Sequence, residues 1–220
     1  MGGDPMKDSI IFKKYDKSDN EAFERTLENV WNYHEYTDNE TIRRAFIKTD
    51  VYRSLCESDY KECVYVDGLF AGIVLGKISP IKAMFINGVY YLKFLKYVLL
   101  LKVHSNESRH ILKNFKAMYK VYKALLKKKH KSVKSELILF MVDPLFQRQG
   151  LGKLLVERFE KALVKKYKKN YYLFTDSQCN YGFYETNLYT KVEQESTSES
   201  LKNGQRELTI MLYSKHLRGR

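Results

Sequence analysis

Residues 143–152 read Asp-Pro-Leu-Phe-Gln-Arg-Gln-Gly-Leu-Gly, and the fold prediction starts from this stretch. It follows an apolar run from Leu137 to Val142, which predicts a strand, and it precedes a helical pattern that begins at Gly150. It contains no evident nucleophile or metal ligand. A segment rich in chain-bending residues between two regular elements often presents its backbone, so the question is what that backbone would hold.

Gly150 and Gly152 lie in the first turn of the predicted helix. The first N–H groups of a helix have no intrahelical partner, and the helix macrodipole places about half a positive charge there. Glycine allows a ligand to approach the backbone closely. Three side-chain donors precede the helix: Gln147, Arg148 and Gln149. The stretch therefore predicts a phosphate-binding helix N-terminus.

Two familiar phosphate-binding loops fit the stretch less well. A P-loop requires Lys followed by Ser or Thr, whereas Gly152-Lys153 is followed by Leu154. A Rossmann fingerprint is closer, because Gly150-x-Gly152 opens a helix and Asp176 lies where a ribose ligand would be expected. Leu155 replaces its third glycine, however, and the loop that begins at Asp143 is long. The Rossmann reading is therefore the weaker alternative.

The run from Gln147 to Gly152 resembles the Gln/Arg-x-x-Gly-x-Gly/Ala motif of the GNAT superfamily of acetyl-CoA-dependent N-acetyltransferases. The flanks are also similar, since Met141-Val142-Asp143-Pro144 matches the end of the family's preceding strand, and Asn180 and Tyr184 follow. The resemblance covers residues 136–190 and, more loosely, the early strand, helices and hairpin. It implies a mixed α/β fold, the GNAT acyl-CoA N-acyltransferase fold, in which helices flank a mixed central sheet.

The resemblance also implies a site for acetyl-CoA and no metal. The backbone of Gln149 to Lys153 would cradle the pyrophosphate, and Phe140 to Val142 would pair with the pantetheine arm. A main-chain N–H near Val142 would polarise the thioester carbonyl. The full set of expected cofactor-binding residues is Phe140, Met141, Val142, Gln147, Arg148, Gln149, Gly150, Leu151, Gly152, Lys153 and Asn180.

Two catalytic residues are expected from the same resemblance. Tyr184 would protonate the departing thiolate, and Glu136 would be the general base that deprotonates the amine. Glu136 stands eleven residues before Gln147, which resembles the spacing in the histone-acetylating branch of the family. The alternatives are a packing tyrosine and a solvated glutamate at a strand end, while Asp176 would cap a turn. The expected reaction is direct attack of a primary amine on acetyl-CoA, with the acceptor open between a small molecule and a protein.

The remaining pattern predicts a mixed α/β domain. Further strands are expected at residues 10–15, 171–175, 190–195 and 206–213, and a hairpin at 63–78 turns at Asp67-Gly68. Helices are expected to begin at Asp19 or Asn20 and at about Asn39, and to cover 150–167 and 181–187. The inward residues of the helix at 150–167 are expected to be Leu151, Leu154, Leu155, Phe159, Ala162 and Leu163.

Residues 80–134 contain 14 Lys or Arg and one acid, so they carry the whole formal net charge of +13. This break predicts a basic helical insertion within a single domain of residues 6–220. We expect a helical hairpin, apolar around residues 90–101 and amphipathic from 111 to 126, with Ser105 or Ser108 as a cap of the second helix. Its lysines would solvate the outer face, attract an acidic partner or lie on anionic lipid, and its apolar half could form a homodimer surface. Its aromatic residues fall at core spacing, so nucleic-acid binding is not indicated.

The composition, 44% hydrophobic over 220 residues, suits one folded domain. The three cysteines, Cys56, Cys63 and Cys179, have no paired spacing, which predicts a reducing, cytoplasmic location. Lysines interrupt the most apolar stretch, 89–103, so no transmembrane segment is expected. Residues 1–5, ahead of Met6, are expected to be an expression scar. The alternative function is a non-catalytic acyl-CoA-binding or interaction module that docks its basic hairpin on an anionic partner.

Overall fold

The computed structural model of the protein describes residues 9–79, 86–104, 106–129 and 132–217. The expected expression scar at residues 1–5 and the capping candidate Ser105 lie outside these residues. Part of the expected insertion, residues 80–85 and 130–131, also lies outside them.

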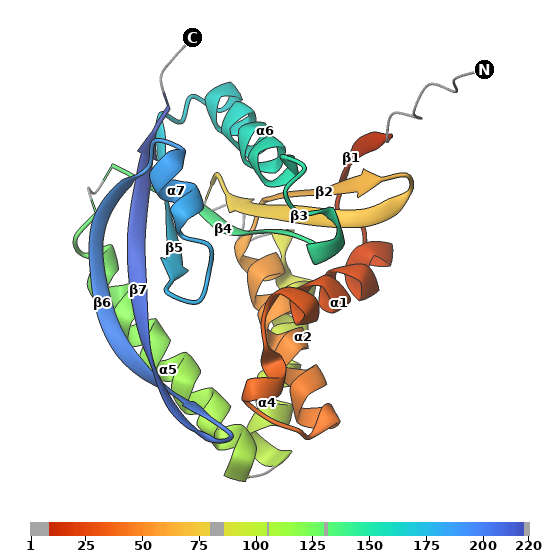
Figure 1. Cartoon of the computed structure of the whole chain (residues 1–220), viewed down its shortest axis with the longest axis vertical. Helices are drawn as coiled ribbons and strands as arrows, with labels where there is room; N and C mark the ends of the chain where they lie inside the picture. Colours follow the sequence, from red (N-terminus) through yellow and green to blue (C-terminus); the bar gives the residue numbers. More distant parts are fainter. Residues whose placement is uncertain (1–8, 80–85, 105, 130–131, 218–220) are drawn as a thin grey trace.

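One mixed sheet of seven strands organises the chain (Figure 1). The spatial order is β1-β2-β3-β4-β5-β7-β6, and every neighbouring pair is antiparallel except β4 and β5, which are parallel. The strands are β1 (Ile10–Lys14), β2 (Tyr60–Val66), β3 (Leu69–Lys77), β4 (Ser135–Val142), β5 (Asn170–Asp176), β6 (Thr190–Leu201) and β7 (Gly204–His216). The predicted mixed α/β fold is confirmed.

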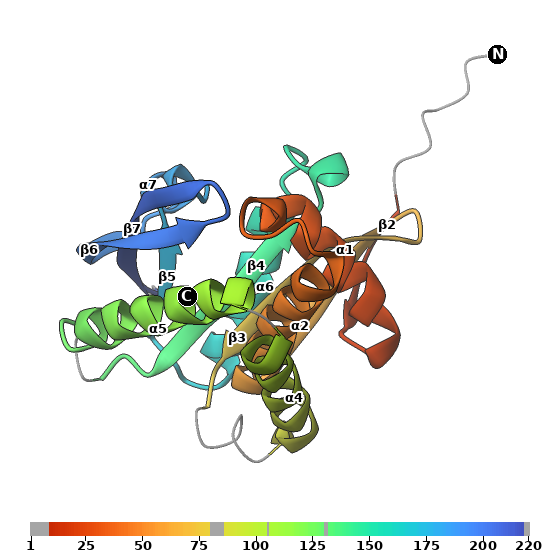
Figure 2. The same cartoon turned by 90° about the horizontal axis from the view of Figure 1, so that it is seen from below.

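Helices cover both faces of the sheet (Figures 1 and 2). The α-helices are α1 (Asn20–Val30), α2 (Glu40–Glu57), α4 (Gly88–His104), α5 (Asn106–Leu126), α6 (Leu151–Lys165) and α7 (Gly182–Thr186). The 3-10 turns among the described residues are η1 (Lys17–Asp19), η2 (Tyr33–Glu35) and η3 (Pro144–Phe146). Helix α6 packs on one face, whereas α1, α2 and α4 share a core with the other face and α5 packs against β5 and β7.

The hairpin of β2 and β3 turns at Asp67-Gly68, as predicted. Asp67 has φ 50° and Gly68 has φ 80°, so both central residues adopt the left-handed conformation that this tight turn requires. Glycine carries no steric penalty in that conformation, and aspartate tolerates it better than most residues. The local sequence was therefore sufficient to predict this turn.

The hairpin of β6 and β7 is longer than its polar sequence indicated. Its strands reach Leu201 and Gly204, beyond the predicted ends at residues 195 and 206. The side chain of Asn114 on α5 supports the extension, because it accepts from the backbone N–H of Ser200 and donates to the carbonyl of the same residue. This support comes from a helix 86 positions away in the chain, so local patterning does not reveal it.

Helix α6 buries Leu151, Leu155, Phe159 and Leu163, in agreement with the sequence pattern. The inward assignment of Leu154 is wrong, since its side chain is 37% exposed, and Val156 occupies the core instead. Leu154 lies near the N-terminus of α6, where the buried face of the helix begins. Ala162 is partly buried against the same core.

The two helices between β3 and β4 differ from the expected helical hairpin in their packing (Figure 2). Helix α4 packs on α2, where the rings of Tyr52 and Tyr97 stack 5.7 Å apart. Helix α5 packs along the β6–β7 hairpin and over β5, where the rings of Tyr122 and Phe174 stack 4.5 Å apart. Ser108 lies within α5 and is buried. Each helix therefore packs against the rest of the domain rather than mainly against the other helix.

Gly76 on β3 faces the buried ring of Phe159, and a Cβ at this position would lie 2.1 Å from that ring. We expect Gly76→Ala to lower the free energy of unfolding by about 1–3 kcal/mol, because the packed ring has no free space to enter. Urea denaturation measures the difference. Gly88→Ala is the matched control, since a Cβ there meets nothing within 4 Å. Equal stability of Gly76→Ala and the wild type would contradict this packing.

Candidate functional site

Strands β4 and β5 separate soon after they begin. They pair only at Ser135 with Tyr171, Glu136 with Tyr172 and Leu137 with Leu173. From Leu139 onward β4 continues to pair with β3, so only its other edge is left without a strand partner among the described residues. The separation opens a gap whose wall is the backbone of residues 138–142.

A β-bulge in β4 coincides with the separation. Leu75 of β3 lies opposite Leu139, and the next residue, Gly76, lies opposite Leu137. Ile138 is therefore an extra residue in β4, and such a bulge bends a strand and re-aims its backbone groups. The bulge lies where the ladder between β4 and β5 stops.

The loop after β4 is held in place by Asp143. Its carboxylate accepts from the N–H of Leu145 at 3.1 Å, which caps η3, and from the hydroxyl of Thr26 on α1 at 3.1 Å. The Gln147 side chain donates to the carbonyl of Val142 at 3.1 Å. Gln147 therefore shapes the loop, while Arg148 and Gln149 are exposed to solvent.

Helix α6 begins without a side-chain cap. Gly150, the N-cap residue, has φ 80°, and the first bond of the helix runs from the N–H of Leu154 to the carbonyl of Gly150. The N–H groups of residues 151–153 precede that bond, so they lack intrahelical acceptors. This end of the helix suits an anion, because the backbone N–H groups and the macrodipole both favour negative charge.

The first turn of α6 lies against the end of β4. A Cβ on Gly152 would lie 3.5 Å from the ring of Phe140 and 3.8 Å from Val142, which is ordinary contact distance. Leu151 is buried in the core beneath. Met141 points into the core on the opposite face of the sheet, so only its backbone faces the gap. Phe140, Val142 and the helix terminus thus form one continuous surface along the gap.

Tyr184 on α7 is buried beside this gap. Its ring lies 6.1 Å from the ring of Phe140 and 5.4 Å from that of Tyr213. Burial, followed by the charge of Cys179, raises the pKa of Tyr184 well above its ordinary value, although a hydrogen bond with Thr175 of β5 acts in the opposite direction. The phenol therefore stays protonated at neutral pH and can serve as a proton donor.

Two further groups lie at the end of β5. Asp176 accepts from the N–H of Gln178 at 2.8 Å, which confirms its predicted capping of the turn. Burial raises the pKa of Asp176, and burial together with the neighbouring Asp176 raises the pKa of Cys179 to about 12. The sequence prediction did not single out Asp176 as a proton acceptor, because burial of a carboxylate at a strand end is a tertiary property. Asn180 is exposed at the start of α7.

Glu136 lies on the paired part of β4, before the gap opens. Its carboxylate accepts from the hydroxyl of Tyr172 at 2.8 Å and forms an ion pair with the Lys77 ammonium at 2.6 Å. The structure thus separates Glu136 from the other expected site residues and gives its carboxylate two partners. Both contacts engage the same carboxylate oxygen, Oε2. The predicted role of general base remains a prediction that this geometry disfavours.

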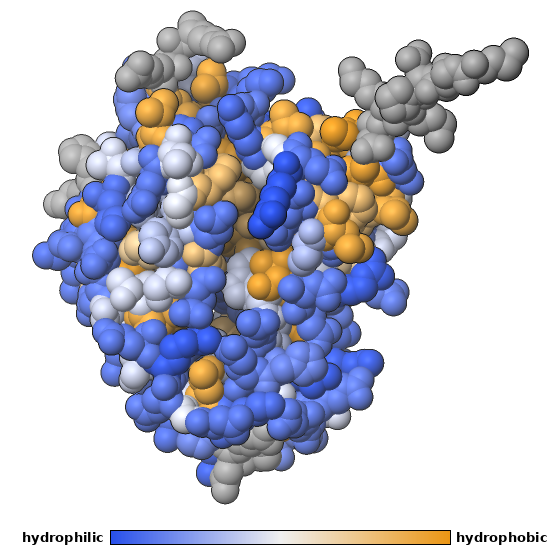
Figure 3. Space-filling model, in the orientation of Figure 1, coloured by the Kyte–Doolittle hydropathy of each residue, from blue (hydrophilic) through white to orange (hydrophobic). Residues whose placement is uncertain are grey.

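Polar contacts join the β6–β7 hairpin to η2 and the residue after it. Arg206 forms ion pairs with Glu199 and Glu35, and the Tyr36 hydroxyl donates to Glu199 at 2.7 Å. The backbone N–H of Lys202 donates to the carbonyl of Glu35 at 2.9 Å. Figure 3 shows that this face of the molecule is hollowed between the hairpin and α1, with a mostly hydrophilic rim.

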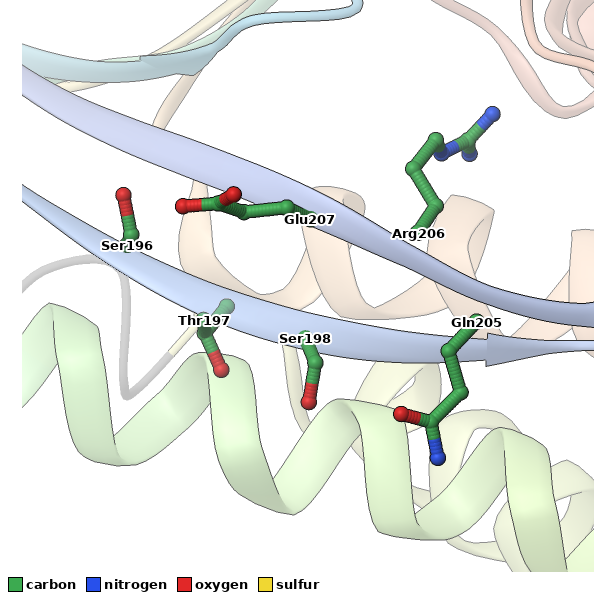
Figure 4. Close-up of a pocket in the computed structure, with 6 residues that line it drawn as sticks. All are labelled: Ser196, Thr197, Ser198, Gln205, Arg206 and Glu207. Carbon is green, nitrogen blue, oxygen red and sulfur yellow. The ribbon is translucent and has the colours of Figure 1, made fainter.

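A second, open recess of about 480 Å³ lies on the hairpin itself. Its lining residues come from both strands and are Ser196, Thr197, Ser198, Gln205, Arg206 and Glu207 (Figure 4). Thr197, Ser198 and Gln205 point toward α5, Ser196 and Arg206 point away from it, and Glu207 extends along the hairpin toward Ser196. All of these residues belong to β6 and β7, whereas the candidate site is formed by β4, the loop after it, α6 and α7. Within the described ranges, no group of three or more His, Cys, Asp or Glu could hold a metal ion.

Comparison with known proteins agrees with this geometry. The family model of the acetyltransferase (GNAT) domain matches residues 123–208, which contain β4, the loop, α6, β5 and Tyr184. Over these residues the chain is similar to the acetyltransferase domain of the GNAT superfamily. An acyltransferase of the GNAT type is the activity that this match supports. A comparison with curated proteins gave no match.

Solved structures share the GNAT fold over nearly the whole chain. Ard1 from Thermoplasma volcanium has a TM-score of 0.53 at 14% identity, covering 96% of this chain and 99% of that one. The PaiA N-acetyltransferase from Thermoplasma acidophilum, solved with coenzyme A, has a TM-score of 0.50 at 16% identity and covers 94% and 99%. The yncA protein of Salmonella typhimurium, with its cofactor acetyl-CoA, has a TM-score of 0.52 at 13% identity and covers 96% and 95%.

Gly150→Glu should abolish coenzyme A binding, because its carboxylate would occupy the anion-binding end of α6. Coenzyme A and acetyl-CoA should raise the Tm of the wild type, and the variant should lose this shift. Gly150→Ala is the matched control, since it carries the same backbone strain of about 1 kcal/mol without the charge. We expect it to melt lower and still respond to both ligands. A Tm shift with NAD, or an undiminished shift in Gly150→Glu, would contradict the site.

Proposed function

We propose that the protein is an N-acetyltransferase that transfers the acetyl group of acetyl-CoA directly to a primary amine of a small molecule or a protein. The observation that carries the proposal is the gap between β4 and β5, which has an uncapped helix N-terminus at one side and Tyr184 beside it. A strand edge without a partner is rare in a buried sheet, since backbone groups require hydrogen bonds. A bound ligand with amide groups would supply those bonds.

The proposed cofactor contacts follow the gap from end to end. The N–H groups of residues 149–153 would bind the pyrophosphate, and the exposed guanidinium of Arg148 would add charge. The free edge of β4 from Phe140 to Val142 would hydrogen-bond the pantetheine amides, and Asn180 would contact the cofactor from α7. When bound, acetyl-CoA supplies the activated acetyl group. A main-chain N–H of β4 near Val142 would polarise the acetyl carbonyl.

Tyr184 is the proposed general acid. As the amine nitrogen bonds to the acetyl carbon and the carbon–sulfur bond breaks, the phenol would donate its proton to the thiolate. A tyrosine phenol is protonated at neutral pH, and burial raises the pKa of Tyr184 further, so the proton is retained until the thiolate forms. The surrounding rings of Phe140, Tyr189 and Tyr213 exclude water from the proton-transfer path.

Asp176 is a better-placed candidate base than Glu136. Its charge is among the influences on the pKa of Tyr184, so the two groups lie close enough to interact. Its own pKa is raised by burial, which makes its carboxylate a stronger proton acceptor than an exposed aspartate. Glu136, by contrast, is engaged by Lys77 and Tyr172.

Tyr184→Phe should reduce kcat by about 10²- to 10⁴-fold, the usual contribution of a general acid, while the Tm shift with coenzyme A stays unchanged. Tyr189→Phe is the matched control. Its hydroxyl bonds that of Tyr171 at 2.6 Å, so the variant should lose about 1 kcal/mol of stability and keep its turnover. Release of coenzyme A thiol with a panel of amines gives the rate. The alternative, a non-catalytic acyl-CoA-binding module, predicts no amine-dependent thiol release from the wild type.

Asp176→Asn and Glu136→Gln separate the two candidate bases through their pH profiles. A base must be ionised, so kcat/KM should rise with pH through the raised pKa of Asp176, and Asp176→Asn should remove this acidic limb. The limb should persist in Glu136→Gln. Burial disfavours the charged form of Asp176, so Asp176→Asn should melt no lower than the wild type at neutral pH. Loss of the limb in Glu136→Gln alone would return the role to Glu136.

The three cysteines are free, which suits the proposed cytoplasmic location. Among the helices that the structure describes, none has the length and apolar character needed to cross a bilayer.

A further inference from the structure

Helix α4 has two apolar faces, and only one of them packs against the rest of the described protein. Tyr90, Phe94, Tyr97 and Leu101 pack into the core formed with α2. On the opposite face, four aliphatic side chains recur at three-to-four spacing: Leu92, Leu95, Leu99 and Val103. Leu92 is 67% exposed, Leu99 59% and Val103 74%. A continuous exposed apolar stripe of this kind is rare on a soluble surface and marks an interaction site.

Basic residues flank the stripe on both sides. At 3.6 residues per turn, Lys96 falls on one side of the line from Leu92 to Val103 and Lys102 falls on the other. Lys93 lies further round the helix, with its ammonium 5.0 Å from the ring of Tyr52. None of these three lysines forms an ion pair with a described residue, and the described residues 86–104 include no acid. The face therefore combines an aliphatic centre with uncompensated positive charge.

The stripe is on the outside of the molecule. Figure 2 shows α4 at the margin of the fold, beyond α2, on the side opposite to the loop between β4 and α6. No other described element covers its outer face, as the exposure of Leu92 and Val103 shows. Contact through this face would therefore leave the loop and the hollow of Figure 3 open to ligands.

We propose that the outer face of α4 docks the protein on an anionic lipid bilayer. Leu92, Leu95, Leu99 and Val103 insert into the boundary between headgroups and acyl chains, while Lys96 and Lys102 extend to the lipid phosphates. Helix α4 has 17 residues and lies parallel to the bilayer surface. The charge of the face matches a surface rich in acidic phospholipids, which attracts each nearby Lys by about 1 kcal/mol.

The chemistry of the face argues against two other occupants. A second copy of the chain would bring the unpaired lysines of two α4 helices together, and that repulsion opposes a symmetric contact. Nucleic acid would contact the lysines but not the aliphatic side chains between them. Single-stranded bases stack on aromatic rings, and Tyr91 is the only exposed aromatic residue on α4.

Vesicle sedimentation of the full-length protein tests the proposal. Wild-type protein should pellet with vesicles of equal parts phosphatidylcholine and phosphatidylserine, bind weakly to phosphatidylcholine alone, and dissociate as salt is added. Leu92→Ser/Leu99→Ser and Lys96→Glu/Lys102→Glu should each weaken binding by at least about tenfold. All four side chains are exposed or flank the exposed face, so both variants should keep the wild-type Tm and its shift with coenzyme A.

Matched controls come from surfaces far from α4. Leu69→Ser changes another exposed leucine, on the turn of the β2–β3 hairpin, and Lys165→Glu/Lys168→Glu reverses two exposed lysines at the end of α6. Both should bind vesicles like the wild type. The proposal is overturned if wild-type protein does not bind the anionic vesicles, or if the α4 variants bind them as well as the controls do. It is also overturned if Leu92→Ser/Leu99→Ser disperses a dimer in sedimentation velocity while vesicle binding is unchanged.

Discussion

The parting of two parallel strands is the constraint on which the rest of the structure depends. Strands β4 and β5 share three paired positions and then separate, so residues 139–142 pair with a strand on one side only. Such an edge inside a sheet is costly unless something else satisfies its polar groups. The bulge at Ile138, the loop held by Asp143 and the uncapped start of α6 all lie along this opening. Together they form the opening to which we assign the cofactor.

Packing on both faces keeps the strands apart. On one face, α6 buries Leu155, Phe159 and Leu163 across the sheet. On the other, α5 fills the space beneath β5 and β7 and supports the long β6–β7 hairpin through Asn114. The hairpin is joined to η2 by Arg206 and Glu199, of which Glu199 is buried. The two helices that interrupt the domain between β3 and β4 are thus part of its structural support, and α4 adds a surface that the domain itself does not bury.

Predictions that rested on short-range stereochemistry agreed with the structure. The turn at Asp67-Gly68 requires positive φ at two residues, and the Gly150 N-cap requires it at one, so the residue types alone indicate both conformations. Predictions that depended on partners distant in the chain were less reliable. Leu154 is exposed although it fits the helical pattern. The Glu136 carboxylate contacts Lys77 and Tyr172, and the local sequence around Glu136 does not indicate either contact. Asp176 gained its raised pKa only through burial.

The sequence by itself determined the elements, the glycine-containing turn that leads into α6 and the concentration of positive charge in one segment. These follow from residue type, spacing and backbone preference, which act over a few positions. Tertiary structure alone decided that β4 and β5 part, that Tyr184 meets Phe140 and Thr175, and that α4 leaves an apolar face uncovered. Each of these features depends on which distant segments of the chain pack against one another, and that packing exists only in the folded protein.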